Sequence, residues 1–440
     1  MVKDEAFDEW EFPKHKWLVG WTRGIPGLQG PYDFFNEWWS RDLADIVRRN
    51  RNHVSICIWS IGNEIDTPND PYSHPMLEGR YRPDAPNAER MGPIAKRMVA
   101  VVKENDNSRP VSAALQNVPF ALATEYPNAL DIVGYNYTEA RYVEDHKTYP
   151  NRVLFGSENG QGMAQWKAVR DNDFIFGQFL WTGIDFLGES GVWPIRGSQS
   201  GMLDLCGFFK PRAYFRQALW ADKPVAYVGS SLIPTIGQGQ SSRGPATDAQ
   251  PRWNYDDGQI VRVSCYTNAA KARLLLNGRE VGATKDYDDE TGIIFWDIPF
   301  AAGTLEVEGL DATGNKTCGS AIRTSGKPYA LTAKVDASSI SNGKGLAQIV
   351  LQIVDENGIP VFLADNEITC TIEGPAKLLG LEASNPTDMS NYRDNIHRVF
   401  RGRMLAYIQA TGDTGGITVK FASPLLNSVE VKLPTGDSSH

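Results

Sequence analysis

The sequence predicts an α/β region followed by a β region: an incomplete (β/α)₈ barrel and then two immunoglobulin-like β-sandwiches. Two observations carry this prediction. Up to about residue 221, six short apolar runs alternate with helical patterns, and each run ends in polar residues. Beyond Trp220 the chain changes to short β-rich runs divided by turn residues. Alternating strands and helices indicate a parallel sheet, whereas evenly spaced short strands indicate sandwiches.

The run over residues 54–64 is the clearest strand. Its apolar residues Ile56, Ile58 and Ile61 show no period-2 alternation, and the run is too short for an ordinary helix. A strand of this kind is buried on both faces, as in parallel sheets. Asn63 and Glu64 then stand at its carboxyl end, which is where barrels place their chemistry.

The other elements of the first region follow the same order. The sequence predicts strands over 1–5, 109–114, 130–137, 152–158 and 174–183, and helices over 31–49, 88–105 and 163–172. A complete barrel has eight strands and roughly 250 residues. Six strands in a region that ends near residue 220 therefore predict a barrel that lacks two strands.

The second region predicts two sandwiches of roughly 100 residues each. We assign the barrel to residues 1–221 and the sandwiches to 222–326 and 327–440, with a linker near 325–328. Turn signals such as Asn277-Gly278, where a positive φ is easily adopted, separate the strands. No residues in either block converge on a chemical site.

Composition narrows the classes of partner. The formal net charge of −9 provides no basic surface and argues against nucleic acid or an anionic membrane as partner. No apolar run approaches the roughly 18 residues of a membrane span. The five cysteines are widely spaced without a CxxC motif, so they indicate neither a zinc site nor a disulfide framework, and they leave the compartment open. The 12 Trp suit sugar rings as well as hydrophobic cores.

Two carboxylates suggest the chemistry. Glu64 and Glu158 each end an apolar strand, so in a barrel both side chains face one cleft. Glycoside hydrolysis needs such a pair, one acting as acid and the other as nucleophile or base. Considered alone, each has a structural reading, because Gly-Asn-Glu can close a strand as a polar turn and Glu158 can be a surface loop acid. We assign no metal to the neighbouring acids Asp8, Glu9 and Glu11, and no cofactor.

Several segments resemble glycoside hydrolase family 2, which contains β-galactosidases, β-glucuronidases and β-mannosidases. Residues 59–64, Trp-Ser-Ile-Gly-Asn-Glu, preceded by 51–55, resemble the acid/base motif of that family. Residues 4–10 resemble its third barrel strand and residues 176–189 its eighth. The runs at 274–278 and 354–358 resemble the sandwiches that follow the barrel in β-galactosidase-like members. The resemblance covers nearly the whole chain in the same order.

The resemblance implies roles for seven residues. Glu64 would be the general acid/base and Glu158 the nucleophile of a retaining double displacement. The implied substrate-binding residues are Asn63 for the hydroxyl next to the anomeric carbon, Tyr137 for the nucleophile, Trp181 for a subsite wall, and Asp4 and Glu5 for further sugar hydroxyls. The sequence gives Asp185 and Glu189 no role beyond loop structure.

The chain also departs from the family pattern. Val54 stands where the family usually has Pro, and residues 159–162 after the nucleophile are short, which leaves the aglycone side of the pocket undefined. Relative to the family, an N-terminal sugar-binding sandwich, an immunoglobulin-like domain and barrel strands one and two are missing. Losing two strands exposes sheet edges. We expect either that the chain is a fragment, which we favour, or that a partner chain completes the barrel.

Three functions follow from these observations. The first is a retaining exo-acting β-glycosidase, with β-galactosides as the expected substrates. The second is a non-catalytic carbohydrate-binding or assembly fragment, inactive because its barrel is incomplete. The third, an endoglucanase of the wider barrel superfamily, is disfavoured by the trailing sandwiches. The sequence leaves the sugar and the compartment open, although related bacterial enzymes are often periplasmic or secreted.

Overall fold

A computed structural model describes residues 1–18, 30–233, 247–336, 340–341, 345–412 and 415–436. The chain divides into two compact units, Met1–Gly183 with Leu187–Trp193, and Ile184–Phe186 with Pro194–His440. Among the described residues, no helix has both the length and the apolar character needed to cross a membrane. Each unit is considered by itself below.

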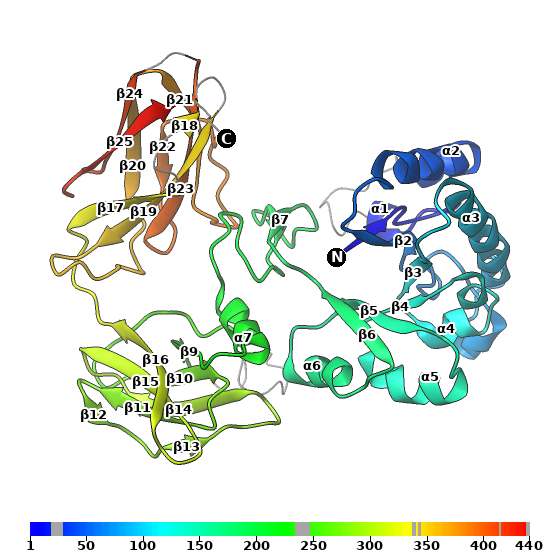
Figure 1. Ribbon diagram of the computed structural model, residues 1–440, viewed down its shortest axis with the longest axis horizontal. Coiled ribbons are helices and arrows are strands. Elements are labelled where there is room, and N and C mark those ends of the chain that lie inside the picture. Colours follow the sequence, from blue (N-terminus) through cyan, green and yellow to red (C-terminus); the bar gives the residue numbers. More distant parts are fainter. Residues whose placement is uncertain (19–29, 234–246, 337–339, 342–344, 413–414, 437–440) are drawn as a thin grey trace. The chain divides into compact units, whose positions relative to one another are not determined.

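The first unit is built on a six-stranded parallel sheet in the order β1-β2-β3-β4-β5-β6. Figure 1 shows the helices α2 Tyr32–Asn50, α3 Met91–Asn105, α4 Val118–Leu122 and α5 Tyr142–Thr148 along the outer side of the strands. The strands are β1 Val2–Glu5, β2 Ile56–Asn63, β3 Val111–Leu115, β4 Val133–Asn136, β5 Leu154–Asn159 and β6 Ile175–Leu180. Because β1 and β6 are the two edges, the sheet is an open, incomplete barrel, which confirms the predicted fold class.

Parallel register brings the carboxyl ends of neighbouring strands to one edge. Asp4 pairs with Trp59 across β1 and β2, and Asn63 pairs with Ala114 across β2 and β3. Strand β2 is buried over most of its length, as its unbroken apolar run predicts. Its Ile61 joins the core that the sheet forms with the helices.

The helix predicted over 31–49 is α2, Tyr32–Asn50. Asp33 lies in its first turn and Arg48 and Arg49 in its last, which matches the helix dipole. Its buried Leu43 and Val47 face the core. The other helices of this unit are α1 His15–Leu18, η1 Pro75–Arg80, η2 Ala88–Arg90, α3 Met91–Asn105, α4 Val118–Leu122, η3 Pro127–Ala129, η4 Glu139–Arg141, α5 Tyr142–Thr148 and α6 Met163–Arg170.

The second unit is mostly antiparallel β-structure, which confirms the predicted β domains. Its first part has the sheets β14-β10-β9 and β12-β11-β15-β16, and β13 pairs with β11. The bounds are β9 Ala226–Leu232, β10 Ile260–Thr267, β11 Lys271–Leu276, β12 Arg279–Glu280, β13 Lys285–Asp286, β14 Ile293–Pro299, β15 Thr304–Leu310 and β16 Lys316–Arg323. Helix α7, Pro211–Trp220, precedes them, and the short strands β7 Phe186–Leu187 and β8 Gly197–Ser198 lie before α7 in the chain.

The last part of the chain has the sheets β17-β19-β23-β21 and β18-β25-β24-β20-β22 around a separate apolar core. The bounds are β17 Ala330–Val335, β18 Ile340–Ser341, β19 Leu346–Val354, β20 Glu367–Glu373, β21 Ala376–Glu382, β22 Ile396–Arg398, β23 Arg403–Ala410, β24 Gly416–Ala422 and β25 Val429–Gly436. The domain boundaries placed at 222 and 327 stay a prediction.

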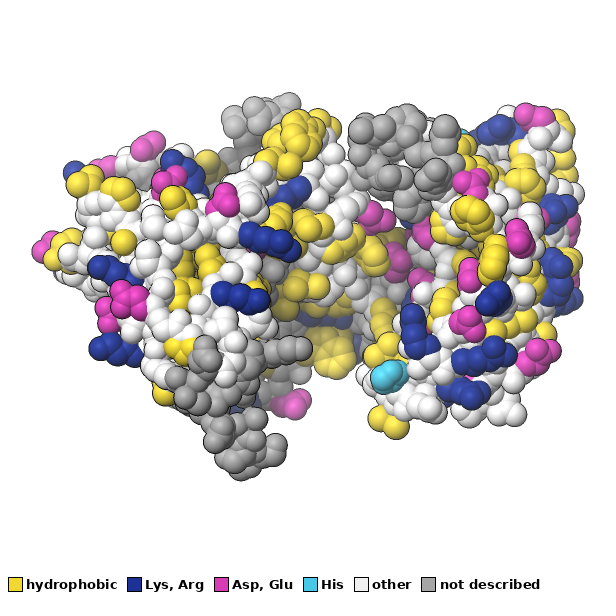
Figure 2. All heavy atoms as spheres, turned by 90° about the horizontal axis from the view of Figure 1, so that it is seen from above, with side chains coloured by type: hydrophobic (Ala, Val, Ile, Leu, Met, Phe, Trp, Pro, Cys, Tyr) yellow, Lys and Arg dark blue, Asp and Glu magenta, His cyan; other side chains and the backbone are white. Residues whose placement is uncertain are grey.

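Charged side chains are mixed in sign over the visible surface. Figure 2 shows Lys and Arg interspersed with Asp and Glu on the face that it draws. This distribution agrees with the modest negative net charge of the sequence.

Candidate active site

The strand ends of the first unit turn sharply at the residues that carry polar side chains. Glu64, directly after β2, has φ +50°, and Tyr137, directly after β4, has φ +53°. The backbone N–H of Glu64 still donates to the carbonyl of Ala114 at 2.8 Å. Non-glycine residues in this left-handed region cost conformational energy and cluster at functional sites. The turn therefore points to the carboxyl edge of the sheet as the functional edge.

A cavity of about 340 Å³ opens at this edge. Five of the seven residues that the sequence singles out line it. The lining residues are Lys14, Lys16, Asn63, Glu64, Thr67, Asp70, Gln116, Tyr137, Glu158, Trp181 and Glu189. The ends of β2, β3, β4, β5 and β6 and the segment after β1 therefore contribute to a single site.

Asp4 and Glu5 do not line this cavity. Asp4 accepts a hydrogen bond from Asn50 of α2 at 2.7 Å, which places its carboxylate on the helix side of the sheet. Glu5 accepts from the Ser60 hydroxyl at 2.6 Å and pairs with Lys3 at 2.8 Å. Successive side chains of a strand point to opposite faces, which explains why these two acids separate.

Glu158 is held by Tyr137. The Tyr137 hydroxyl donates to Oε2 of Glu158 at 2.9 Å. Burial, together with the negative charge of Glu64, raises the pKa of Glu158 to about 7, although the Tyr137 hydrogen bond opposes that rise. The charge of Glu64 is thus felt at Glu158, so the two carboxyl groups are electrostatically coupled.

Asn136 fixes the other carboxylate and was missed by the sequence reasoning. This buried side chain donates from Nδ2 to Glu64 Oε1 at 3.1 Å and to Asn63 Oδ1 at 3.2 Å. Its Oδ1 accepts from the Ser157 hydroxyl at 2.6 Å. The feature of the sequence that could have indicated Asn136 is its position near the end of a predicted strand, directly before Tyr137.

Two lysines border the cavity and were also missed. Lys14 donates to the carbonyl of Asn63 at 2.7 Å and lies 3.5 Å from Asp8. Lys16 pairs with Asp8 and lies 3.9 Å from Glu189. Burial opposes ionisation of Asp8, but the two lysine charges prevail and lower its pKa. The positive charges at the rim therefore already have carboxylate partners.

Gln116 is a fourth residue that the sequence did not single out. Its Oε1 is buried and accepts no hydrogen bond from the described residues. Its backbone N–H donates to the fully buried Asp66 at 2.9 Å, and so does the N–H of Asn117. Asp66 thereby fixes where the chain leaves β3 and presents Gln116 to the cavity.

The acids near the end of β1 do not converge. Glu9 accepts backbone N–H groups of Lys14 and Tyr32, and Glu11 forms a bidentate pair with Arg90. Among the residues that the structure describes, no group of three or more His, Cys, Asp or Glu could hold a metal ion.

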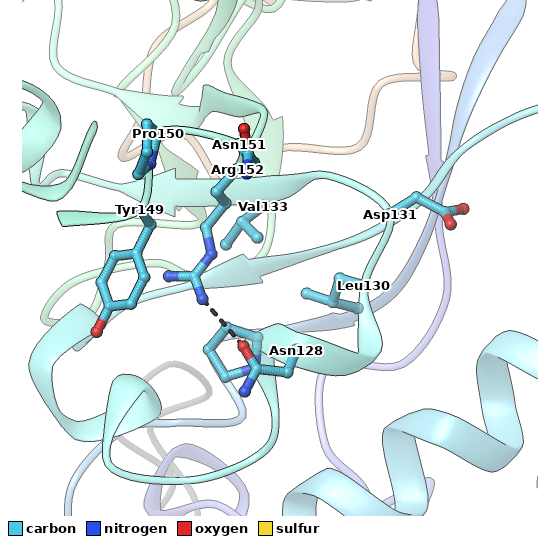
Figure 3. A pocket seen from close by; sticks show the side chains of 9 residues that line it. Asn128, Leu130, Asp131, Val133, Tyr149, Pro150, Asn151 and Arg152 are labelled. Atoms are coloured by element: carbon cyan, nitrogen blue, oxygen red, sulfur yellow. Dashed lines mark hydrogen bonds between the residues drawn. The ribbon is translucent and has the colours of Figure 1, made fainter. Parts of the chain in front are cut away.

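A second cavity, of about 390 Å³, lies at the opposite ends of β4 and β5. Figure 3 shows Arg152 there, donating to Asn128 at 3.0 Å, and its guanidinium lies 4.0 Å from the Tyr149 ring centre. Its only acid, Asp131, forms an ion pair with Lys103 at 2.6 Å. Because it contains no pair of carboxylates, we place the chemistry in the cavity at the carboxyl edge.

Three family models match the chain. Residues 36–155 match the TIM barrel domain of glycosyl hydrolases family 2, and residues 331–432 match glycoside hydrolase family 2 C-terminal domain 5. Residues 258–318 match a domain of unknown function. The first match lies in the unit with the parallel sheet, the second in the last β part of the chain, and the third in the β part before it.

Individual proteins that are similar to this chain over most of its length carry names that fit these family models. A β-galactosidase from Bacteroides ovatus is 28% identical over 98% of this chain and 54% of its own length. A putative β-glucuronidase from Formosa agariphila is 25% identical over 93% of this chain and 40% of its own length. A solved glycosyl hydrolase family 2 member from Bacteroides cellulosilyticus superimposes with a TM-score of 0.83 at 26% identity, over 99% of this chain and 55% of that protein. The chain spans about half the length of the curated relatives that it matches.

Proposed function

The chain carries the barrel and C-terminal domains of glycoside hydrolase family 2, and from this premise we propose that it is a retaining β-glycosidase acting on terminal β-galactosides. One observation carries the proposal: Glu64 and Glu158 line one cavity and are coupled electrostatically. A retaining mechanism needs two carboxyl groups roughly 5–5.5 Å apart. We expect that separation between Glu64 and Glu158.

The proposed reaction has two steps. Glu64 donates its proton to the glycosidic oxygen while the Glu158 carboxylate attacks the anomeric carbon, so the C–O bond to the aglycone breaks and an ester to Glu158 forms. Glu64, now ionised, takes a proton from water, which attacks the same carbon and releases Glu158. Protons and bonds balance over the two steps, and no cofactor is required.

The neighbouring groups suit these roles. In the proposed first step Glu64 is the proton donor and Glu158 is ionised, and the Tyr137 hydroxyl stabilises the ionised Glu158. Asn136 orients Glu64 and Asn63 together. We assign Asn63 to the hydroxyl next to the anomeric carbon and Trp181 to an apolar face of the sugar ring.

The charges at the rim support a neutral sugar. A uronate would need an uncompensated cation, whereas Lys14 and Lys16 are paired with Asp8, and Lys16 also with Glu189. The name of the Bacteroides ovatus relative agrees with a galactoside, whereas that of the Formosa agariphila relative indicates a glucuronide. We therefore place galactosides first and glucuronides second.

The test compares the wild-type chain, Glu158→Gln and Glu64→Ala on 4-nitrophenyl β-galactoside and β-glucuronide. We expect Glu158→Gln to lose turnover by more than about 10³-fold, and Glu64→Ala to lose roughly 10²–10⁴-fold, the usual contribution of a general acid. Glu144→Gln, at an exposed position of α5, is the matched control, and we expect it to leave the rate unchanged.

Three outcomes would contradict the proposal. If Glu158→Gln retained the wild-type rate, Glu158 would not be the nucleophile. If the wild-type chain bound galactose analogues without turning over either substrate, the non-catalytic carbohydrate-binding alternative would replace the enzyme. The first-formed sugar should be the β-anomer by NMR, and an α-anomer would exclude retention.

A further inference from the structure

A small, strongly charged cavity lies inside the second unit, and none of its lining residues belongs to the candidate active site. It measures about 70 Å³ and is bordered by the segment 185–210 and by loops next to β21, β22 and β23. The residues that line it are Asp185, Arg196, Gly197, Ser198, Gln199, Asp204, Leu205, Lys210, Ser384, Pro386, Phe400 and Arg401. The charged groups here are three cations and two carboxylates.

Arg196 is the most buried of these cations. Only 8% of its side chain is exposed. Its Nη2 pairs with Glu382 at 2.9 Å, and its Nε donates to the carbonyl of Asn385 at 3.2 Å. Its Nη1 is buried and makes no hydrogen bond to the described part of the chain. A buried donor without an acceptor costs about 1–3 kcal/mol, and more when it is charged.

Lys210, Asp185 and Asp204 each have a partner of opposite charge, whereas Arg401 has none among the described residues. Lys210 uses all three of its donors, on both oxygens of Asp185 at 2.8 and 3.0 Å and on the carbonyl of Gln199 at 2.7 Å. Asp204 pairs with Arg403 at 3.2 Å. The lining therefore keeps one uncompensated positive charge.

Arg401 supplies that charge. It stands in the left-handed conformation, φ +53°, in the tight turn between Phe400 and Arg403. Its guanidinium lies 5.0 Å from the Phe400 ring centre and 5.7 Å from that of Phe362, and within the described residues it has no hydrogen bond or ion pair. Burial and the charge of Arg403 lower the pKa of Arg401, and the charges of Asp204 and Asp185 oppose that lowering only in part, so a further anion beside Arg401 would be favourable.

We propose that this cavity binds one small oxyanion, held by Arg196 Nη1 and the Arg401 guanidinium. A water needs roughly 10–15 Å³ of such space, so 70 Å³ holds one tetrahedral oxyanion or one carboxylate group, but no sugar ring. Guanidinium groups are the preferred protein donors for phosphate, sulfate and carboxylate oxygens. The bound anion would join the segment around Arg196 to the turn that carries Arg401, and would stabilise the second unit.

Isothermal titration of the full chain with inorganic phosphate, sulfate and acetate tests the site, with sodium chloride at matched ionic strength as the reference. We expect one anion per chain and at least tenfold weaker binding in Arg401→Gln. Arg401→Lys should bind with intermediate affinity because it keeps the charge without the planar donors. Tighter binding of phosphate and sulfate would identify an inorganic ligand, whereas tighter binding of acetate would identify a carboxylate; either result supports the site.

Thermal unfolding provides the second readout. Phosphate and sulfate stabilise most proteins through exclusion from their surface, so only the difference between variants is informative. We expect the anion-dependent rise in Tm to be smaller in Arg401→Gln and Arg196→Lys than in the wild type. Arg398→Gln, at an exposed position of β22, is the control and should keep the full rise. Equal rises in all four proteins, or no saturable binding to the wild type, would overturn the proposal.

Discussion

Tyr137 and Glu158 are joined by two hydrogen bonds. The Tyr137 hydroxyl donates to Oε2 of Glu158 at 2.9 Å, and the backbone N–H of Tyr137 donates to the Glu158 carbonyl at 2.8 Å. The second bond continues the pairing of β4 with β5 beyond the end of β4. The sheet itself therefore sets the position of the tyrosine against the proposed nucleophile.

Replacing Tyr137 by Phe should move the pH profile. The hydroxyl lowers the pKa of Glu158, so its loss raises a pKa that already lies at about 7. Because the nucleophile must be ionised, the acid limb of kcat/KM should shift to higher pH. A hydrogen bond to a charged group is worth about 1.5–3 kcal/mol, which corresponds to roughly 1–2 pH units.

The measurement is the pH dependence of kcat/KM on 4-nitrophenyl β-galactoside, which reports the groups of the free enzyme. Tyr149→Phe, at the opposite end of the sheet, is the matched control and should leave the profile unmoved. An acid limb at the wild-type position in Tyr137→Phe would mean that Glu158 does not need this hydroxyl.

Asn136→Ala should damage both stability and activity. The substitution removes the donor to Glu64 and Asn63 and the acceptor for Ser157 in a buried place. Each buried group left without a partner costs about 1–3 kcal/mol. We expect a loss of at least about 2 kcal/mol in the free energy of unfolding from urea titration, and a fall of roughly 10–100-fold in kcat/KM, of the order that such a loss of orientation gives.

Asn128→Ala is the comparison for that variant, because Asn128 is exposed and donates to none of the proposed catalytic groups. It should change stability by less than about 0.5 kcal/mol, as surface substitutions usually do. An Asn136→Ala protein with normal kcat/KM would show that Glu64 needs no orienting amide.

Much of the fold could be predicted from the sequence because local and global signals agree. The unbroken apolar run of β2 and the one-sided spacing of α2 each match their burial in the structure. The polar residues at strand ends could be predicted to meet, because parallel strands end at one edge. Asn63, Glu64, Tyr137, Glu158 and Trp181 do line one cavity.

The rest of the site depends on distances that a sequence does not contain. Asn136 reads as an ordinary strand residue, and its importance comes from Glu64, which lies on another strand. Lys14 and Gln116 stand in loops whose course is set by buried contacts to Asp8, Asn63 and Asp66. Asp4 was expected near the sugar, but strand alternation turns it toward Asn50.

Asp66→Asn should flatten the dependence of stability on pH. Burial raises the pKa of Asp66 from 3.8 to about 6, and the charge of Glu64 adds to the rise. A carboxyl whose folded pKa is raised contributes stability below its unfolded pKa and loses it as pH rises through the folded value. The wild type should therefore lose about 3 kcal/mol from this group between roughly pH 4 and pH 6.

Urea unfolding at pH 4, 5, 6 and 7 measures this effect in wild type and variant. Because Asn does not titrate, the free energy of unfolding of the wild type should fall relative to that of Asp66→Asn as pH rises. The expected relative fall is about 3 kcal/mol between roughly pH 4 and pH 6. Asp84→Asn, which is well exposed, should reproduce the wild-type slope. Parallel curves for wild type and Asp66→Asn would mean that Asp66 does not carry this dependence.

Gln116→Leu should separate binding from stability. The buried Oε1 of Gln116 has no donor among the described residues, and Leu has nearly the same volume without the polar atoms. Removing a buried unsatisfied group is neutral or stabilising, so we expect Tm to rise or stay constant. If the amide forms a hydrogen bond with a substrate hydroxyl, its loss costs about 0.5–1.5 kcal/mol of binding free energy, which raises KM roughly 2–10-fold and leaves kcat within about twofold.

Differential scanning fluorimetry measures the Tm, and steady-state kinetics on the same preparation measure KM and kcat. A higher Tm with an unchanged KM would show that the Gln116 amide destabilises the fold and does not contribute to substrate binding. A higher Tm with a raised KM would show that the same amide destabilises the fold and binds substrate.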